Sequence, residues 1–330
     1  MPGCDILSEL PPGPSENMSP PVQASEQEPE PEEPAQPEPD GPSAWELRFE
    51  TWPMEFGFAN DEGSKLIRTF YEYAVSDEPV EVVTEVELAE DAVEEEEYDP
   101  DVAAELRDAT GFDPDRFSLA VGRYSDIWPI YFSRWQDESR GNSGRETAFN
   151  FNNLPGFVYG QKEWNLSNNK TYLMTGMDTL IDSMVAISAP VWRGNTPPMA
   201  DETVQSIVEY KGREVVWAKT LAVTTVGEGL IGVVLFERQG NDMLFSIVYM
   251  DDKKTLFWDN PAEYDETSTW RADAGEEPGE FEVLLLSRFD EGLLLILTWA
   301  ASEGEKVLVL YEDGGRFVQR EVGFTRYWGA

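Results

Sequence analysis

The last third of the chain carries the same order of apolar and polar positions twice. Residues 221–236 and residues 284–299 align without a gap at a spacing of 63 residues. After one deletion the similarity resumes, with residues 247–252 matching residues 309–314. This part of the chain therefore consists of two copies of one unit, and we expect both copies to fold alike.

Each copy predicts a meander of about four antiparallel strands. Its apolar runs are rich in valine, isoleucine, leucine and aromatic residues and are about 6 to 9 residues long, as strands are. Breaks rich in glycine, asparagine and aspartate separate these runs and predict tight hairpin loops. The second copy is almost continuously apolar over residues 283–286, 293–297 and 307–310. Such runs indicate strands that are covered on both faces.

These copies determine the fold class that the sequence predicts. We expect a mainly β protein with a few short helices, built from tandem antiparallel four-strand meanders of about 63 residues. A unit of this size is typical of a propeller blade, and the alternative is one sheet of a β-sandwich. Residues 117–135 predict two strands joined at Ser125 and Asp126, which form a weaker third copy.

Upstream of the copies the pattern predicts single elements. The alternation of Trp45, Leu47, Phe49 and Trp52 indicates a half-buried strand. Residues 62–74 place apolar side chains at helical spacing, which predicts a helix.

Three further elements follow in this acidic part of the chain. Residues 80–88 alternate valine or leucine with glutamate, which predicts an edge strand with a charged outer face. Asp99 and Pro100, followed by further acidic residues, are typical of a helix start. The motif Asp113–Asp115, with its central proline, predicts a second helix cap or a turn.

Composition divides the chain into three regions. Residues 1–45 are rich in proline and glutamate and poor in apolar residues, which predicts a disordered acidic tether. Residues 46–115 are expected to form a mixed α/β acidic segment that packs on the rest. Residues 116–330 are expected to form a β-rich repeat domain, in which the clearest copies cover residues 213–264 and 281–328.

The net charge of −41 limits the possible partners. Residues 1–110 carry 31 acidic side chains against 4 basic ones, and residues 111–330 carry 34 against 20. A chain this acidic repels polyphosphate, so we expect no nucleic-acid partner. The charge is compatible with a basic partner, with a salt-rich habitat or with solubility alone.

The absence of histidine narrows the possible chemistry. Without histidine, Ser-His-Asp and Cys-His catalysis and nearly all transition-metal sites are excluded. The one cysteine excludes an intramolecular disulfide and a cysteine zinc site. We find no nucleotide motif, so we expect no catalytic, cofactor-binding or metal residues, although carboxylate chemistry stays possible. No apolar run reaches about 18 residues, so no transmembrane segment is expected.

That cysteine, Cys4, lies at the start of the tether. Gly3 precedes it and a long polar linker follows, an arrangement that resembles the mature start of a bacterial lipoprotein. The resemblance covers only these few residues and implies that Cys4 is lipidated and that Asp5 favours inner-membrane retention. It requires a signal peptide upstream of Met1. As written, the chain is expected to be cytoplasmic, and the alternative is an extracytoplasmic lipoprotein that Cys4 anchors to the membrane.

Aromatic residues supply a candidate binding surface. A segment rich in asparagine, glycine and aromatics includes Phe157, Tyr159 and Trp164, and Trp192 lies in a later connector. These rings could stack on sugars or peptides, and irregular structure packed on a sheet explains them equally well.

Three functions follow from these observations. The first is a non-enzymatic β-rich binding or assembly protein on an acidic tether, with a protein or glycan ligand. The second is a carboxylate-dependent glycan hydrolase, which needs two facing carboxylates in an aromatic cleft. The third is an acidic inhibitor or immunity-type protein for a basic partner, which salt would weaken.

Overall fold

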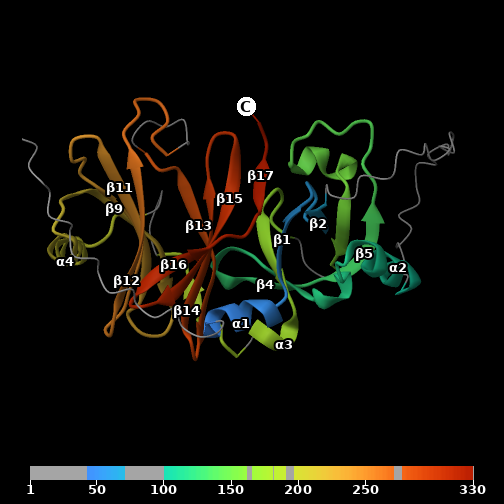
Figure 1. The fold of residues 1–330 in the computed structure, drawn as a ribbon, viewed down its shortest axis with the longest axis horizontal. Helices are drawn as coiled ribbons and strands as arrows, with labels where there is room; N and C mark the ends of the chain where they lie inside the picture. Colours follow the sequence, from blue (N-terminus) through green and yellow to red (C-terminus); the bar gives the residue numbers. More distant parts are fainter. Residues whose placement is uncertain are drawn as a thin grey trace, which may run out of the picture. The chain divides into compact units, whose positions relative to one another are not determined.

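A computed structural model of the chain describes residues 43–70, 100–161, 166–180, 182–190, 197–270 and 277–329. The chain divides into two compact units, Met1–Gly41 and Pro42–Ala330, and all described residues belong to the second. Strands outnumber helices and form three sheets, so this unit is mainly β with a few short helices, as predicted (Figure 1).

Each repeat copy forms one antiparallel meander, as the sequence predicts. The first meander consists of β9 (Val215–Thr224), β10 (Leu230–Phe236), β11 (Asp242–Met250) and β12 (Thr255–Glu263), with the short β8 (Ile187–Ser188) beside β9. The second consists of β13 (Glu280–Phe289), β14 (Gly292–Ala300), β15 (Gly304–Asp313) and β16 (Arg316–Arg320), and β17 (Thr325–Tyr327) also pairs with β15.

The second meander is buried on both faces. Along β14, Leu293, Leu295 and Leu297 pack against the first meander, whereas Leu294 and Ile296 pack toward the remaining sheet. All five side chains are fully buried, because successive strand residues point to opposite faces and both faces are covered. The prediction from the continuous apolar runs is therefore confirmed.

The two meanders form packed layers. β12 contacts β16 at one edge, and β9 contacts β13 at the other. This face-to-face packing is the arrangement of the β-sandwich alternative. The outer face of the first meander is covered by α4 (Asp201–Lys211), whose Ile207 packs on Val234 and Phe236.

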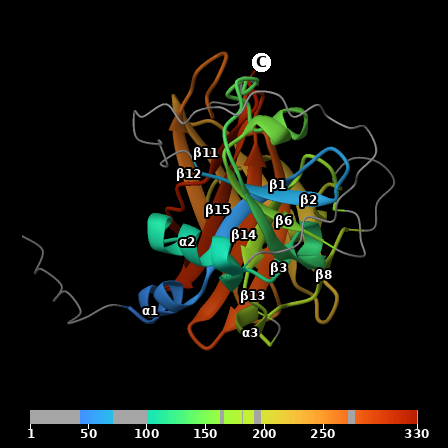
Figure 2. The same cartoon turned by 90° about the vertical axis from the view of Figure 1, so that its right-hand side faces the viewer.

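The third sheet lies beside the second meander and is curled (Figures 1 and 2). Its order is β4-β3-β7-β1-β2-β6-β5. The strands are β1 (Met54–Ala59), β2 (Lys65–Thr69), β3 (Leu119–Val121), β4 (Ile127–Pro129), β5 (Tyr131–Gln136), β6 (Gly156–Gly160) and β7 (Thr171–Thr175). Ile130 alone joins β4 to β5, which are opposite edges of the sheet. The sheet must therefore curl to bring its edges together, and it encloses an aromatic core.

The remaining helices are short. They are α1 (Ala44–Thr51), α2 (Pro100–Thr110), α3 (Met177–Leu180) and the 3-10 helices η1 (Pro114–Arg116), η2 (Arg123–Ser125) and η3 (Ala148–Asn153). The helix predicted at Pro100 is present as α2, and Asp113 caps η1 by accepting a hydrogen bond from the Asp115 amide. The edge strand predicted over residues 80–88 lies outside the described residues.

The strand predicted from Trp45 to Trp52 is wrong, because this segment forms α1. The Ser43 side chain accepts from the Glu46 amide and the Glu46 carboxylate accepts from the Ser43 amide, a capping box that starts a helix. Trp45, Phe49 and Trp52 are spaced so that one helical face presents all three to the core, whereas Leu47 is exposed.

The helix predicted over residues 62–74 is also wrong in its described part. Residues 65–69 form β2, which pairs with β1 and β6. The Asn60 side chain accepts hydrogen bonds from the Ser64 and Lys65 amides, and Gly63 has a φ of 67°. These contacts close a tight loop between β1 and β2, so pairing in the sheet outweighs the helical spacing of apolar side chains. Residues 117–135 likewise form no third meander, since their strands belong to both edges of the curled sheet.

A buried arginine joins β17 to the curled sheet. The Arg326 side chain is fully buried, and its guanidinium donates to the Glu146 and Asn169 carbonyls, to Asn169 Oδ1 and to Thr171 Oγ1, at 2.8–3.2 Å. Glu305 is buried opposite Arg326 in the β15–β17 pair. Burial lowers the pKa of Arg326 to about 10, although Glu305 and Glu146 act in the other direction. We call these five residues the Arg326 cluster.

Candidate functional site

A surface groove of about 420 Å³ lies between the edge strands of the two meanders. β12 forms one wall, β16 forms the other, and the end of α4 closes one side. We call it the edge groove, and its lining residues are Tyr210, Lys211, Phe257, Trp258, Asp259, Gly315, Arg316, Phe317, Val318 and Gln319. Figure 1 shows β12 and β16 side by side, with α4 near them.

Tyr210 presents an exposed ring at this groove. α4 carries Asp201 and Glu202 in its first turn and ends at Gly212, whose φ of 64° is the left-handed conformation favoured by glycine. This places Tyr210 in the last turn, stacked on Phe257 with a ring-centroid distance of 5.1 Å and an interplanar angle of 25°. Tyr210 is 64% exposed, so the groove carries an aromatic platform that faces solvent.

One acidic side chain of the described residues lines the groove, and it is fixed in place. Both carboxylate oxygens of Asp259 accept from Lys211 Nζ at 2.7 Å, and Oδ1 also accepts from the Ser246 hydroxyl at 2.6 Å. The Lys211 ammonium lies 4.2 Å from the centroid of the Phe257 ring. Lys211 and Asp259 thus neutralise each other and hold the base of the aromatic platform.

The wall formed by β16 has a free backbone edge within the described chain. Gly314 and Gly315, with φ of 56° and 77°, form the two-residue loop between β15 and β16. Residues that flank such a loop form a hydrogen-bonded pair, and these pairs alternate along the ladder. The N–H and C=O groups of Phe317 and Gln319 therefore point away from β15, at the end of the sheet order.

Two arginines of β16 have no ion pair within 4.0 Å among the described residues. Arg316 is exposed. Arg320 is half-buried, and its guanidinium lies 4.2 Å from the centroid of the Phe49 ring. Burial lowers the pKa of Arg320, because it disfavours the charged form. Acidic side chains outnumber basic ones 65 to 24 in this chain, so two arginines without a carboxylate partner are a notable feature of β16.

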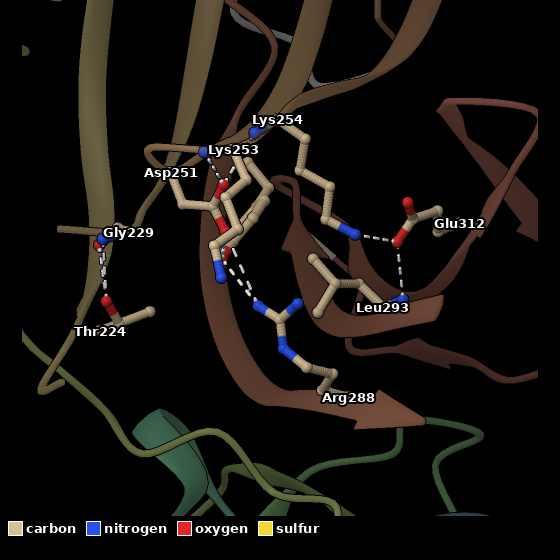
Figure 3. Close-up of polar contacts among 9 residues, drawn as sticks. Thr224, Gly229, Asp251, Lys253, Lys254, Arg288, Leu293 and Glu312 are labelled. Atoms are coloured by element: carbon tan, nitrogen blue, oxygen red, sulfur yellow. Dashed lines mark hydrogen bonds and ion pairs between the residues drawn. The ribbon is translucent and has the colours of Figure 1, made fainter. Parts of the chain in front are cut away.

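A second polar cluster joins the meanders at another end (Figure 3). Asp251 of the first meander pairs with Arg288 of the second at 3.7 Å, and Lys254 of the first pairs with Glu312 of the second. Each meander thus supplies one acid and one base. The Glu312 carboxylate also accepts from the Leu293 amide at 2.9 Å.

Hydrogen bonds determine the protonation of this cluster. Partial burial acts to raise the pKa of Asp251, but bonds from the Lys253 amide, the Tyr249 hydroxyl and the Lys254 amide outweigh it and lower the pKa. Burial and then the Asp251 carboxylate raise the pKa of Tyr249 to about 12. Asp251 is an acceptor and Tyr249 its donor, which suits an inter-sheet contact.

A larger cavity, of about 530 Å³, lies between β1, β2 and the segment that joins β16 to β17. Glu55 and Glu146 line it together with Phe56, Phe70 and Phe324. Arg68 Nε binds Glu55 Oε2 at 3.2 Å, and Glu146 Oε1 accepts from the Thr69 hydroxyl at 2.6 Å. Both carboxylates are thus acceptors in existing contacts.

A general acid in glycan hydrolysis needs a raised pKa at an open site. Burial raises the pKa of Glu305, which is a member of the Arg326 cluster and does not line this cavity. Its Oε1 is buried without a hydrogen-bond partner. The raised pKa therefore belongs to a buried contact between sheets.

The aromatic surface predicted from sequence is not exposed in its described part. Phe157 and Tyr159 are fully buried in the core of the curled sheet, because β6 is covered on both faces. Trp164, Trp192 and Cys4 lie outside the described residues.

Two features were sought in the described residues, a metal site and a membrane-spanning helix. Over the described ranges, no three or more Cys, Asp or Glu side chains come together as a possible metal site. In the same ranges, no helix has the length and apolar composition needed to cross a membrane.

Sequence reasoning missed the edge groove, although two signals were present. Asp201 and Glu202 before a periodic segment, with Gly212 after it, mark a helix with Tyr210 in its last turn. The Gly314–Gly315 pair marks β16 as the outer strand of a hairpin. That Tyr210 and β16 meet is a tertiary fact, since they are about a hundred residues apart.

Comparison with known proteins adds no identity. No protein-family model matches the sequence, and no curated protein or solved structure shows significant similarity to it.

Proposed function

We propose that this chain is a non-enzymatic binding protein whose ligand occupies the edge groove. The observation that carries the proposal is Tyr210, whose ring is 64% exposed and stacks on Phe257 at the groove. Large exposed aromatic side chains beside a concave surface are the residues that most often dominate binding energy. The groove also holds fixed polar groups, which orient a ligand.

The chemistry of the groove supports binding over hydrolysis. Glycoside hydrolysis needs two carboxylates on either side of the scissile bond. Among the residues that the structure describes, Asp259 is the one carboxylate that lines the edge groove, and Lys211 and Ser246 hold it. An acceptor fixed in this way can orient a bound group.

The charge of the chain supports a partner that is basic overall. A net charge of −41 creates a field that accelerates encounter with cations. We therefore expect association to slow as salt is raised, because salt screens the steering between distant charges.

The test is a parallel screen of the full chain against a random-peptide library and a glycan array. Ligands selected on the wild type are measured again with Tyr210→Ser and, as a matched control, with Phe149→Ser, since Phe149 is an 87% exposed aromatic outside the groove. Loss of a binding anchor costs about 2 kcal/mol, so we expect about thirtyfold weaker binding for Tyr210→Ser.

Phe149→Ser should bind as the wild type does. If neither screen yields a ligand, or if the selected ligands are insensitive to Tyr210→Ser, the edge groove is not the binding site and the proposal fails.

A further inference from the structure

Two features of β16 indicate a peptide ligand, its free backbone edge and its two arginines without an ion pair among the described residues. The Phe317 and Gln319 backbone groups point away from β15, at the end of the second meander sheet. Such an edge accepts an extended segment as an additional strand. All of β16 except Arg320 lines the edge groove, so an added strand would lie against the site already described.

The side chains of β16 indicate which peptide fits. Arg316, Val318 and Arg320 share one face of the strand, because alternate residues point the same way. Residues directly opposite on neighbouring strands also share a face, and opposite charges there stabilise the pair. Among the described residues, no carboxylate lies within 4.0 Å of the Arg316 or Arg320 guanidinium. Asp313 is opposite Arg316 in the backbone register of the hairpin, but the two side chains form no ion pair.

We propose that β16 is the docking edge for an extended peptide segment of a partner protein. The segment adds as a further strand to the second meander sheet and places two carboxylates, four residues apart, opposite Arg316 and Arg320. An apolar residue between them lies opposite Val318. This inference rests on the proposed function, since it identifies the ligand of the edge groove.

Other ligands fit these observations less well. A sugar uses the Tyr210 platform but leaves the free backbone edge of β16 without a partner. A polyacidic peptide matches the arginines, yet the field of a chain with a net charge of −41 repels it. Two carboxylates at one spacing satisfy both arginines at the smallest cost in repulsion.

The first experiment measures binding of labelled nine-residue peptides to the full chain by fluorescence anisotropy. Each peptide is built from β-branched residues and two glutamates, with the glutamates four residues apart in one and three apart in the other. Spacing by four puts both carboxylates on one face, whereas spacing by three puts them on opposite faces. We expect the first peptide to bind more tightly by up to about fivefold, since an exposed ion pair contributes up to ~1 kcal/mol.

The second experiment tests the backbone and the arginine. Gln319→Pro removes an N–H that points away from β15, which an edge strand tolerates, and Gln319→Ala keeps it. We expect Gln319→Pro to bind about tenfold more weakly than Gln319→Ala, because both variants lack the Gln319 side chain and only the proline variant also lacks the N–H. Arg316→Gln should weaken binding, whereas Lys253→Gln, an equal charge change at an exposed lysine outside the groove, should not. Urea unfolding of each variant verifies that it is folded.

The inference is overturned if the two glutamate spacings bind equally, or if Gln319→Pro binds as Gln319→Ala does. It is also overturned if the wild type binds neither peptide. A glycan or a different peptide that binds wild type but not Tyr210→Ser would then leave the proposed function standing. If no ligand from any screen depends on Tyr210, both the proposed function and this inference fail.

Discussion

Replacement of Arg326 by methionine should destabilise the fold more than any change on the surface of the second meander. The Arg326 side chain has no exposed surface, and its three guanidinium nitrogens donate to the Glu146 and Asn169 carbonyls, the Asn169 amide oxygen and the Thr171 hydroxyl. Methionine fills most of the volume and removes every donor. The change therefore isolates the charge and the hydrogen bonds from the packing.

The magnitude follows from the groups that lose their partner. A buried acceptor without a donor costs about 1–3 kcal/mol, and the carbonyl of the buried Glu146 loses both guanidinium donors. Glu305 is also left as a buried acid without its counter-charge. Removal of one partner of a buried pair costs about 3–5 kcal/mol in measured cases, and we expect a loss within this range.

The assay is urea unfolding followed by tryptophan fluorescence, since the chain has 11 tryptophans. With an m-value of about 3 kcal/mol/M, the expected loss lowers the midpoint by about 1–1.7 M. Arg316→Met is the matched control, because it removes the same charge from an exposed position of β16. Its effect should stay within about 0.5 kcal/mol.

A double-mutant cycle with Glu305→Gln separates the attraction between the Arg326 and Glu305 charges from the hydrogen bonds. If the unpaired carboxylate contributes to the loss, Arg326→Met should cost less in the Glu305→Gln background than in the wild type. An Arg326→Met variant that loses less than about 1 kcal/mol, or no more than Arg316→Met, would refute the reasoning.

Three further predictions concern single side chains. The folded pKa of Glu305 is raised, so the fold loses stability as the pH rises above 4.5, the ordinary pKa of a glutamate, and Glu305 must ionise. Glu305→Gln should remove this pH dependence of the free energy of unfolding, and equal pH profiles of wild type and variant would contradict the prediction. The folded pKa of Asp251 is lowered, so Asp251 stabilises the fold above pH 3.8, and this stabilisation is lost as the pH falls through the folded pKa. Asp251→Asn should therefore lower the free energy of unfolding by about 1 kcal/mol at neutral pH and by little in acid, which urea unfolding at each pH would show. Gly292 has a φ of 140°, and an added Cβ would lie 3.0 Å from Glu312, whereas an added Cβ at Gly314 would meet open space. Gly292→Ala should therefore lower the free energy of unfolding by about 1–2 kcal/mol more than Gly314→Ala does. Equal losses in urea unfolding would count against this prediction.

The two meanders could be predicted from the sequence because the residues that define them lie within single hairpins. Gly-rich and Asp-rich breaks set the hairpins, and runs such as residues 293–297 are apolar at every position because both faces of β14 are covered. The segment from Trp45 to Trp52 was predicted wrongly although a local signal was present. Trp45, Phe49 and Trp52 fit both an imperfect alternation and a helical stripe, and the capping box at Ser43 decides for the helix.

The candidate site was only partly accessible to the same reasoning. An exposed tyrosine at a helix end and a short strand with two arginines are ordinary in isolation. Phe157 and Tyr159, which looked available for stacking, are buried because the curled sheet closes around them. Burial depends on what lies across the sheet, and alternation along one strand does not report that.

The sequence by itself determined the fold class, the two meanders, the burial of β14 on both faces and the exclusion of histidine-based and zinc chemistry. These depend on residue type and on spacing within one hairpin, where the physical interactions are between near neighbours. The tertiary structure alone decided that β12, β16 and α4 meet at a groove and that Arg326 closes the contact between β17 and the curled sheet. Such contacts join residues about fifty to 180 positions apart, and their energies come from burial and partner geometry that exist only once the sheets have packed.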